Sequence, residues 1–412
     1  MPLLNLRSHR AALGFILVTA MLDIMAMGIV IPVLPSLIEQ FVGSNARAGA
    51  INGLFVALWA GMQFVASPII GSLSDQYGRR PVILLSCAGL AADYVLMAVA
   101  PNLWWLALGR ILAGVTSSSF TTIYAYMADV TPAEGRARAY GLVGAAFSAG
   151  FVLGPAMGGV LGDIDPRLPF WTAAVMSGVA FLYGLLVLPE SLAPENRMRF
   201  SWRRANPVGA MVLLLRHREL TGLAGVTFLL HFAHHVFSVV FVLYAGHRYG
   251  WGPLQVGLLL AAVGVLDMVM QGLVVGPTVK ALGDRRTMVV GLIGGTVGIA
   301  MMGWAPSGLW FCLAMLPNAM WGLAMPTLQS LMTRRVGEDE QGQLQGATMS
   351  VASIAGVASP LFFGWVYTLT AGEDVAPWRS GVSFLIAAAV LAVAAVIAVI
   401  VARGETATSA TP

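Results

Sequence analysis

The residues with the clearest potential for chemistry are four ionisable side chains inside long apolar stretches: Asp23, Asp93, Arg110 and Asp267. Ionisable groups are costly within a membrane-spanning helix, where they commonly mark paths for protons, ions or substrates. A carboxyl group can carry a proton, whereas an arginine keeps its charge and needs an acceptor or water beside it. We expect Asp23 or Asp93 to be that acceptor. The structural alternatives are an ion pair that only fixes helix packing and a side chain close to the membrane surface.

A second polar group lies on one predicted helix. His231, His234 and His235 stand at positions i, i+3 and i+4, so their side chains share a face. Histidine titrates near neutral pH, which suits a proton relay or a substrate contact. Packing with satisfied hydrogen bonds is one alternative. A zinc site is another, but no Asp, Glu or Cys ligand accompanies the three histidines, and we predict no metal site.

Gln63 and Gln329 are neutral polar residues that also fall inside apolar runs. They could contact a substrate, or they could form hydrogen bonds between helices, each worth about 1 kcal/mol or less. Phe147, Met325 and Trp321 could supply apolar walls to a binding site. At helical spacing, however, such side chains more often pack in a core.

The composition around these residues is that of a membrane protein. Of 412 residues, 58% are hydrophobic and only 10% are charged, with a mean hydropathy of +0.80, whereas soluble domains carry about 25% charged residues. The apolar runs are long enough for helices of ~20 residues that span a membrane. Their continuity excludes a β-barrel, and the first is too long to be a cleaved signal. We count twelve: 12–36, 48–72, 82–100, 103–128, 138–162, 169–188, 219–245, 254–278, 287–304, 308–333, 345–369 and 380–402.

The basic residues orient these predicted helices. In this topology 18 of the 23 Lys and Arg residues lie on one side of the membrane and Arg110 lies within a span. Loops rich in Lys and Arg are cytoplasmic, so both termini are predicted there. The net charge of +4 is therefore a topology signal and predicts no nucleic-acid partner. Cys87 and Cys312 fall inside spans and suggest no disulfide.

A short charged turn, GSLSDQYGRRP at 71–81, separates the second and third apolar runs. We expect Gly71 to let helices approach closely and Gly78 to allow the tight turn. Arg79 could reach an acid across the turn, and Asp75 could lie at the positive N-terminal end of a neighbouring helix. The alternative is a segment that only determines topology.

The chain also contains two related halves. An offset of 205 residues aligns glycines and prolines of the first half with those of the second. Internal repeats of this kind mark transporters, whose substrate sites lie near the midplane between the repeats. We predict a six-helix bundle at 1–188, a cytoplasmic linker at 189–218 and a second bundle at 219–412 with a short C-terminal tail. The aligned pairs are Gly71–Gly276, Gly78–Gly283, Gly141–Gly346, Pro155–Pro360 and Gly159–Gly364; paired arginines follow both turns, displaced by one position, and Asp75 meets Lys280.

Six segments carry a resemblance to a known family: LDIMAMGIVIPVLP (22–35), GSLSDQYGRRP (71–81), ADY (92–94), GRILAG (109–114), GPAMGG (154–159) and QGQLQG (341–346). The first two together with the last form a specific combination. Over nearly its whole length the chain resembles the major facilitator superfamily, and within it the proton-coupled drug antiporters of the tetracycline efflux branch. The resemblance implies an all-α membrane protein with the major facilitator fold, in which twelve transmembrane helices form two pseudo-symmetric six-helix bundles.

The resemblance implies roles for the ionisable residues in proton coupling. Asp23 would face the central cavity, Arg110 would take part in proton transfer, and Asp93 would handle substrate or proton. Asp267 departs from the pattern, because the tetracycline branch carries a histidine there and an aspartate in an Ala-Asp-Gly triplet of the ninth helix. This chain has Gly294-Gly295 instead and no acid in the ninth run. We favour Asp267 as a replacement proton site; the alternative is coupling by the first half alone.

The same resemblance predicts the substrate contacts and the moving parts. Gln63 and Gln329 would face the drug cavity, and His231 and His235 stand where related proteins carry glutamines, which favours substrate contact. The turn at 71–81 would be a cytoplasmic latch for the outward-facing state. Its gating residues are Gly71, Asp75, Gly78 and Arg79, and the small residues typical of proton-driven exporters are Gly150, Gly154, Pro155, Gly158 and Gly159.

The sequence thus predicts an antiporter that exports an amphipathic drug such as tetracycline from the cytoplasm by alternating access. A proton gradient supplies the energy without a cofactor; a divalent cation can accompany the drug if it is tetracycline. The alternatives are a multidrug or endogenous-metabolite exporter, favoured by the missing ninth-helix acid, and, less favoured, a non-transporting membrane sensor or an intramembrane enzyme. We expect a monomer in the lipid bilayer of the inner membrane, with a small drug-like substrate.

Overall fold

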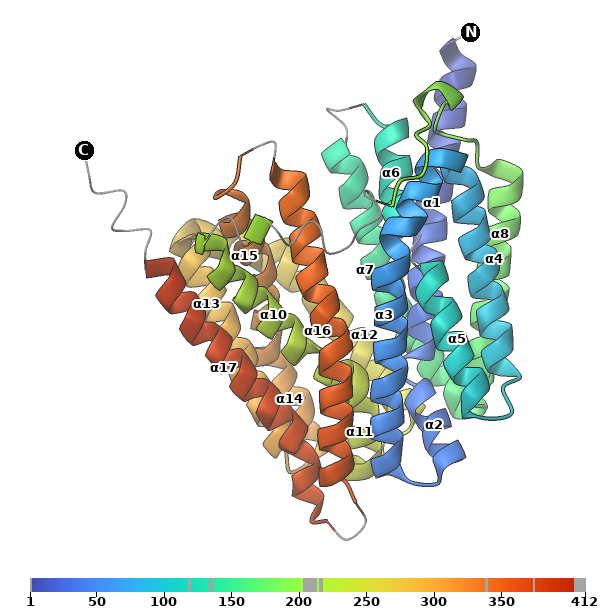
Figure 1. Cartoon of the computed structure of the whole chain (residues 1–412). Helices are drawn as coiled ribbons and strands as arrows, with labels where there is room; N and C mark the ends of the chain where they lie inside the picture. The colour runs from blue at the N-terminus through green and yellow to red at the C-terminus, as the bar shows by residue number, and fades with distance from the viewer. Residues whose placement is uncertain are drawn as a thin grey trace, which may run out of the picture. The chain divides into compact units, whose positions relative to one another are not determined.

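The structure, a computed structural model, consists of helices joined by short connections, and the residues it describes contain no strand (Figure 1). These are residues 2–117, 120–132, 136–202, 213–214, 218–337, 340–372 and 375–403. Most of the predicted linker after residue 202 and the predicted C-terminal tail after residue 403 lie outside them.

The first elements of the described residues run as far as Asn196, within the predicted linker. They are α1 (Pro2–Val30), α2 (Leu34–Val42), α3 (Asn45–Tyr77), α4 (Arg79–Ala98), α5 (Leu103–Thr116), α6 (Phe120–Val130), α7 (Arg136–Ile164), α8 (Leu168–Val187) and the 3-10 turn η3 (Pro194–Asn196). The later elements are α10 (Arg218–Val239), α11 (Phe241–Tyr249), α12 (Pro253–Val269), the π-helical turn η5 (Met270–Val274), α13 (Val275–Trp304), α14 (Gly308–Ala319), η6 (Met320–Leu323), α15 (Ala324–Thr333), α16 (Gln341–Thr370), η8 (Pro377–Gly381) and α17 (Val382–Arg403).

Ten helical segments of the described chain are long and apolar enough to cross a membrane, and Leu103–Thr116 is a shorter apolar helix. One of the ten, Pro253–Trp304, covers two predicted runs. It is broken at Gly283, whose φ of 75° and ψ of 160° are not helical. With α5 and α6 as the fourth crossing, each of the twelve predicted runs falls on helix.

Contacts divide the chain into two compact units. Unit 1 comprises Met1–Phe41, Leu58–Asn206 and Gly252–Ala261, and unit 2 comprises Val42–Ala57, Pro207–Trp251 and Ala262–Pro412. The beginning of α3 therefore groups with the second half of the chain and the beginning of α12 with the first. The division into bundles at 1–188 and 219–412 follows chain order and stays a prediction.

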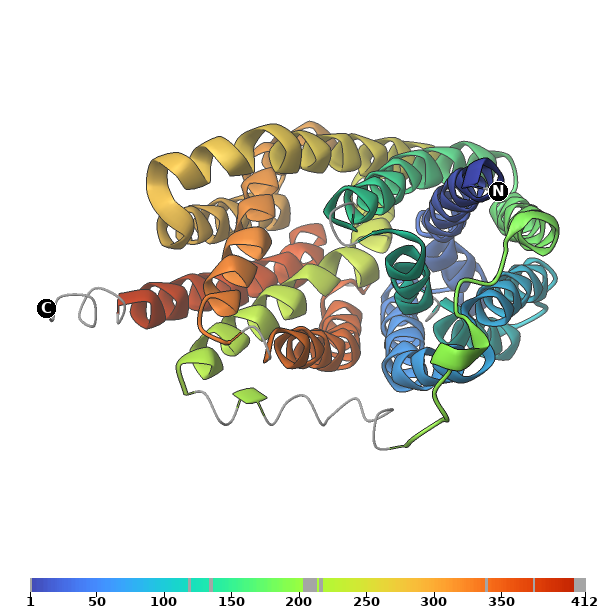
Figure 2. The same ribbon diagram turned by 90° about the horizontal axis from the view of Figure 1, so that it is seen from above.

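Glycines allow close helix crossings in both units. In unit 1, a Cβ atom on Gly257 of α12 would lie 2.7 Å from the Cα of Gly159 on α7. In unit 2, a Cβ atom on Gly53 of α3 would lie 3.2 Å from the Cα of Gly364 on α16. Because Gly159 and Gly364 are partners in the 205-residue repeat, the two units use the same crossing. In the view from above, α1 (dark blue) runs beside α7 (green), its main packing partner in unit 1 (Figure 2).

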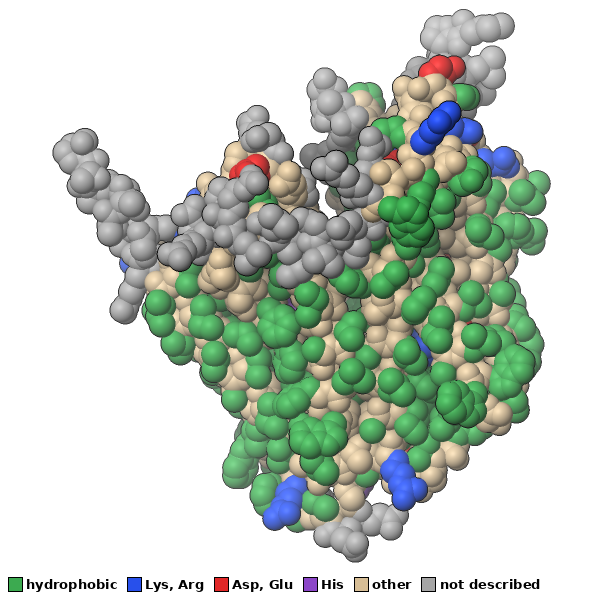
Figure 3. Space-filling model, viewed as in Figure 1, with side chains coloured by type: hydrophobic (Ala, Val, Ile, Leu, Met, Phe, Trp, Pro, Cys, Tyr) green, Lys and Arg blue, Asp and Glu red, His purple; other side chains and the backbone are tan. Residues whose placement is uncertain are grey.

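The surface of the helices is suited to lipid. Large apolar side chains stay exposed along them, among them Leu85, Leu186 and Leu273. Figure 3 shows hydrophobic side chains over most of one face, with charged side chains gathered at its upper and lower ends. Contiguous apolar surface on this scale indicates contact with a membrane.

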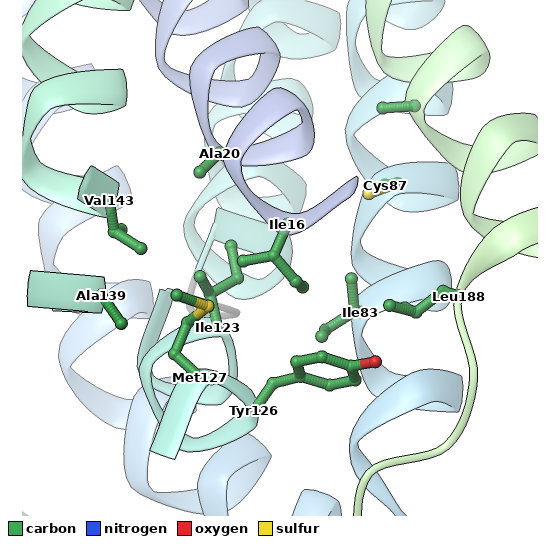
Figure 4. Packing of buried hydrophobic residues seen from close by; sticks show 11 residues of the cluster. Ile16, Ala20, Ile83, Cys87, Ile123, Tyr126, Met127, Ala139, Val143 and Leu188 are labelled. Atoms are coloured by element: carbon green, nitrogen blue, oxygen red, sulfur yellow. The ribbon is translucent and has the colours of Figure 1, made fainter. Parts of the chain in front are cut away.

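A hydrophobic cluster fills one end of unit 1. It joins five elements, α1, α4, α6, α7 and the end of α8 (Figure 4). Tyr126 packs in this cluster, and its hydroxyl donates a hydrogen bond to the Pro189 carbonyl oxygen over 3.1 Å. Cys87 is a free thiol that packs in the same cluster and is 1% exposed. The cluster fixes the ends of α4 and α6, which carry the charged groups described next.

Candidate functional site

The turn between α3 and α4 is built around the Arg79 side chain. Its guanidinium donates to Asp75 Oδ1 over 2.5 Å and to Ser74 Oγ over 2.6 Å on α3. It also donates to Asp129 Oδ2 on α6 over 3.3 Å. Arg79 thus reaches an acid across the turn, as predicted, and ties three helices together. Asp129, at the end of the fourth apolar run, is a partner that the sequence analysis missed.

A second missed acid, Glu190, lies at the N-terminus of α4. Its carboxylate accepts from the backbone N–H groups of Arg79, over 2.8 Å, and Arg80, over 3.3 Å. A carboxylate at this position is favoured by the helix dipole. In unit 1 the carboxylate at the N-terminus of α4 is therefore that of Glu190. We expected Asp75 at a helix N-terminus, but its carboxylate binds Arg79 instead. The only hint of Glu190 in the sequence was the Pro-Glu-Ser segment at 189–191, where the predicted linker begins.

The two glycines of the turn behave differently. Gly78 has a φ of 106° and a ψ of 162°, and a Cβ atom there would collide with the Glu190 carboxylate. Gly78 therefore permits the turn, as predicted. The expectation for Gly71 is wrong among the described residues, because a Cβ atom there would meet nothing within 4 Å. Among the described residues of unit 1, no close approach of helices therefore depends on Gly71.

Gly78→Ala should therefore destabilise the turn. The backbone region of Gly78 is essentially restricted to glycine, and such strain costs of order 1–3 kcal/mol. We expect a lower thermal-unfolding midpoint for the purified variant in detergent, measured by tryptophan fluorescence. Gly141→Ala is the matched control, since a Cβ atom there meets nothing within 4 Å. Equal midpoints for the two variants would contradict this account of the turn.

Asp93 on α4 and Arg110 on α5 form a buried ion pair. Arg110 Nη2 lies 3.6 Å from Asp93 Oδ2, and the side chains are 13% and 0% exposed. The same Arg110 nitrogen contacts Met97 Sδ over 2.8 Å. Gly109 allows this approach, because a Cβ atom there would lie only 2.7 Å from Asp93 Oδ1. Of the two acids expected beside Arg110, the structure pairs it with Asp93.

Asp23 lies on α1 in the same unit and is 3% exposed. Its Oδ1 atom has no hydrogen-bond partner among the described residues. Unit 1 thus holds three of the four predicted proton-coupling residues, Asp23 on α1, Asp93 on α4 and Arg110 on α5. A buried carboxyl group without a counter-charge is costly when ionised.

Asp267 lies in unit 2, near the end of α12, and is half-buried. Among the described residues it has no ion-pair partner. Three residues later the helix widens into the π-helical turn η5 at Met270–Val274. Such turns inside a helix are often found at functional sites. The turn was not predicted, because nothing in the local sequence distinguishes it.

The three histidines lie on α10. His235 Nδ1 is 2.8 Å from the carbonyl oxygen of His231, one turn earlier. His234 is exposed, and its ring centroid lies 5.6 Å from that of Trp321 on η6. Among the described residues no group of three His, Cys, Asp or Glu side chains could hold a metal ion. The substrate role of His231 and His235 stays a prediction.

Of the residues predicted to line the cavity, two have contacts within unit 1 and two are half-buried on α15. Gln63 donates from Nε2 to Ser117 Oγ over 3.4 Å, a bond between helices. Phe147 packs on the hydrophobic cluster of unit 1 and meets the Tyr124 ring edge-to-face at 6.2 Å. Gln329 and Met325, both on α15, are half-buried. The buried Gln329 Nε2 has no hydrogen-bond partner among the described residues.

The small residues of α7 bring this helix close to α1 and α12. Cβ atoms on Gly150 and Gly154 would lie 2.7 and 2.6 Å from α1 carbonyl oxygens, and one on Gly158 would collide with α1 as well. A Cβ atom on Gly28 of α1 would lie 2.9 Å from Pro155 Cδ. Gly159 faces α12 instead. The role of this face in antiport stays a prediction.

The sequence and fold together define a class. The chain is a multi-pass membrane transporter built from two related sets of helices, not an enzyme. The model of the Major Facilitator Superfamily matches residues 16–360 and 223–412, and the chain belongs to this family.

Its relatives include proteins named for tetracycline resistance. The chain is 36% identical to "Tetracycline resistance protein, class C" of Escherichia coli, covering 92% of this chain and 94% of that protein. It is 37% identical to the class G protein of Vibrio anguillarum, covering 85% and 89%.

Solved structures agree on the fold. A bacterial homologue of the human lysosomal transporter Spinster aligns with a TM-score of 0.80 at 15% identity, covering 96% of this chain and 97% of that one. The human organic anion transporter MFSD10 aligns with a TM-score of 0.69 at 22% identity, covering 95% and 99%. These likenesses support the predicted major facilitator fold.

Proposed function

We propose that this protein is a proton-coupled antiporter that exports an amphipathic drug, with tetracycline as the first candidate. The observation that carries the proposal is the buried Asp23 carboxyl group together with the buried Asp93–Arg110 pair, in a chain whose relatives are named for tetracycline resistance. A pump needs a group that binds a proton in one conformation and releases it in the other. Carboxyl groups inside the membrane supply such a group.

The mechanism is alternating access. Protonation of Asp23, together with Asp93 or Asp267, favours one orientation of the cavity, and binding of the drug favours the other. A ligand shifts such an equilibrium only as far as its affinities for the two states differ. Arg110 responds to the charge on Asp93 through their 3.6 Å pair, so proton binding alters the contact between α4 and α5.

The drug contacts are the neutral and titratable residues predicted for the cavity. Gln63, Gln329, His231 and His235 supply hydrogen bonds, while Phe147 and Met325 supply apolar contact. The proton gradient is the energy source, and a divalent cation travels with the drug if the drug is tetracycline. We propose a monomer in the inner membrane with both termini in the cytoplasm, where the Asp75–Arg79 turn acts as a latch.

One observation favours a broader or different substrate. At the place in the ninth helix where the tetracycline branch carries an acid, Gly294 and Gly295 pack tightly on neighbouring helices. A Cβ atom on Gly294 would lie 2.5 Å from Met320 Cβ, and one on Gly295 would lie 2.9 Å from Leu391 Cδ2. An aspartate does not fit there. The second candidate is therefore a multidrug or metabolite exporter of the same family.

Transport in reconstituted liposomes tests both candidates. With an inward-acid gradient imposed on purified protein, we expect tetracycline to accelerate the collapse of the gradient. A panel of amphipathic compounds in the same assay separates a narrow exporter from a broad one. A gradient that collapses at the same rate with every compound and with none contradicts proton-coupled export. Unchanged tetracycline tolerance of expressing cells contradicts the narrow substrate.

A further inference from the structure

The 205-residue repeat relates the Arg79–Asp129 ion pair to a second pair of charged residues. Gly78 and Gly283 are partners in the repeat, and both have a positive φ, 106° and 75°. The same offset takes Arg79 to Asp284 and Asp129 to Arg334. The ion pair of the first half thus has a counterpart in the second half with the two charges exchanged.

This second pair is formed in unit 2. Arg334 Nη2 lies 2.7 Å from Asp284 Oδ2, and Ser330 Oγ donates to the same oxygen over 3.1 Å. It joins the part of α13 that begins after Gly283 to the end of α15. In unit 1, Arg79 and Asp129 join the corresponding α4 and α6, and Ser191 Oγ donates to Asp129 over 3.0 Å.

A neighbouring contact confirms that the two places are equivalent. Arg80 donates from Nη2 to the Leu185 carbonyl oxygen on α8 over 2.9 Å. Its repeat partner, Arg285, donates from Nη2 to the Val399 carbonyl oxygen on α17 over 3.2 Å. The sequence alone aligned the arginine pairs with a displacement of one position. The contacts instead show that Arg80 is equivalent to Arg285. Asp284 is therefore the equivalent of Arg79.

The exchange of charges changes the electrostatics. Negative charge is favoured at a helix N-terminus and positive charge at a C-terminus. Asp284 begins the helical stretch after Gly283, and Arg334 is the C-cap of α15, so both charges lie at favourable ends. Arg79 and Asp129 lie at unfavourable ends, and the Glu190 carboxylate offsets this at the start of α4.

We propose that Asp284 and Arg334 are gating residues of the second half, a latch that holds the ninth helix to the tenth. The proposal rests on alternating access as the proposed function. Asp284 is only 8% exposed, but Arg334 is 71% exposed, and an ion pair whose one partner lies in solvent is screened and contributes little to stability. Because the pair occupies the place of the Arg79–Asp129 pair in the repeat, we assign it a positioning role. It holds the start of the ninth helix against the end of the tenth in one state of the transport cycle.

The test combines neutralisation and exchange of the charges. Asp284→Asn and Arg334→Gln should each lower the maximal rate of proton-driven tetracycline uptake into inverted vesicles by about fivefold, a modest coupling between two states. The double variant Asp284→Arg with Arg334→Asp should recover most of that rate, because it restores the pair. Equilibrium binding of tetracycline, followed by tryptophan fluorescence, should be unchanged. Lys280→Gln, an exposed charge on α13, is the control.

A readout that is independent of transport completes the test. Trypsin should cleave after the exposed Arg286 faster in Asp284→Asn than in the wild-type protein or in Lys280→Gln, because the start of the ninth helix is released. Equal cleavage rates, or equal maximal uptake by wild-type and neutralised variants, would overturn the latch. Wild-type vesicles that take up no drug while cleavage still responds would instead contradict the proposed function.

Discussion

Asp23→Asn is expected to reduce proton-driven drug uptake into inverted vesicles to the background of vesicles without the protein. The asparagine has nearly the same shape but cannot bind and release a proton, so the cycle loses the group that links the gradient to the cavity. Asp23 is 3% exposed, with an Oδ1 atom that lacks a hydrogen-bond partner among the described residues. The substitution removes a costly buried charge, and we therefore expect the variant to fold as well as the wild-type protein.

The control for this prediction is Asp163→Asn, which neutralises an exposed acid near the end of α7. Uptake should be the same as in wild type. Tetracycline binding without a gradient should survive in Asp23→Asn, since binding does not require proton release. Full uptake by Asp23→Asn would remove this residue from the coupling role and leave Asp93 and Asp267 as the candidates.

Hydrophobic length is a local property, and the sequence therefore predicted the helices well. Each run of about twenty apolar residues must satisfy its backbone hydrogen bonds internally once it enters the membrane. The fourth run divides between α5 and α6, and the eighth and ninth meet at the non-helical Gly283. The ninth helix begins at Asp284, three residues before the predicted run, which brings in an acid that the sequence analysis placed outside it.

The charged contacts could be predicted only in part, because they depend on how helices approach. The sequence offered Asp23 and Asp93 equally as partners of Arg110. The choice follows from Gly109, which lets α5 come close to Asp93. Glu190 was overlooked because it stands in a polar linker, far along the chain from the turn that it caps. Asp284 and Arg334 were overlooked because the repeat keeps their positions but exchanges their charges.

The second large effect is expected at the Asp93–Arg110 pair. Removing one partner of a buried ion pair leaves an uncompensated charge and costs about 3–5 kcal/mol, a large part of the ~5–15 kcal/mol that stabilises a typical protein. Asp93→Asn alone should therefore give a low yield of folded protein in detergent, measured by size-exclusion chromatography. Asp93→Asn combined with Arg110→Gln should restore the yield, because neither buried charge is then left unpaired.

The double variant separates the structural role of the pair from its role in transport. If the pair only fixes the packing of α4 on α5, a folded double variant pumps drug at the wild-type rate. If Asp93 binds and releases a proton during the cycle while Arg110 stays charged beside it, the same folded protein binds tetracycline but does not accumulate it when a proton gradient is imposed. We expect the second result, because the buried Asp93 carboxyl group can bind a proton and the charge of Arg110 lies only 3.6 Å away to respond to it. Wild-type accumulation by the double variant would reduce the pair to a packing element and leave Asp23 as the proton carrier of unit 1.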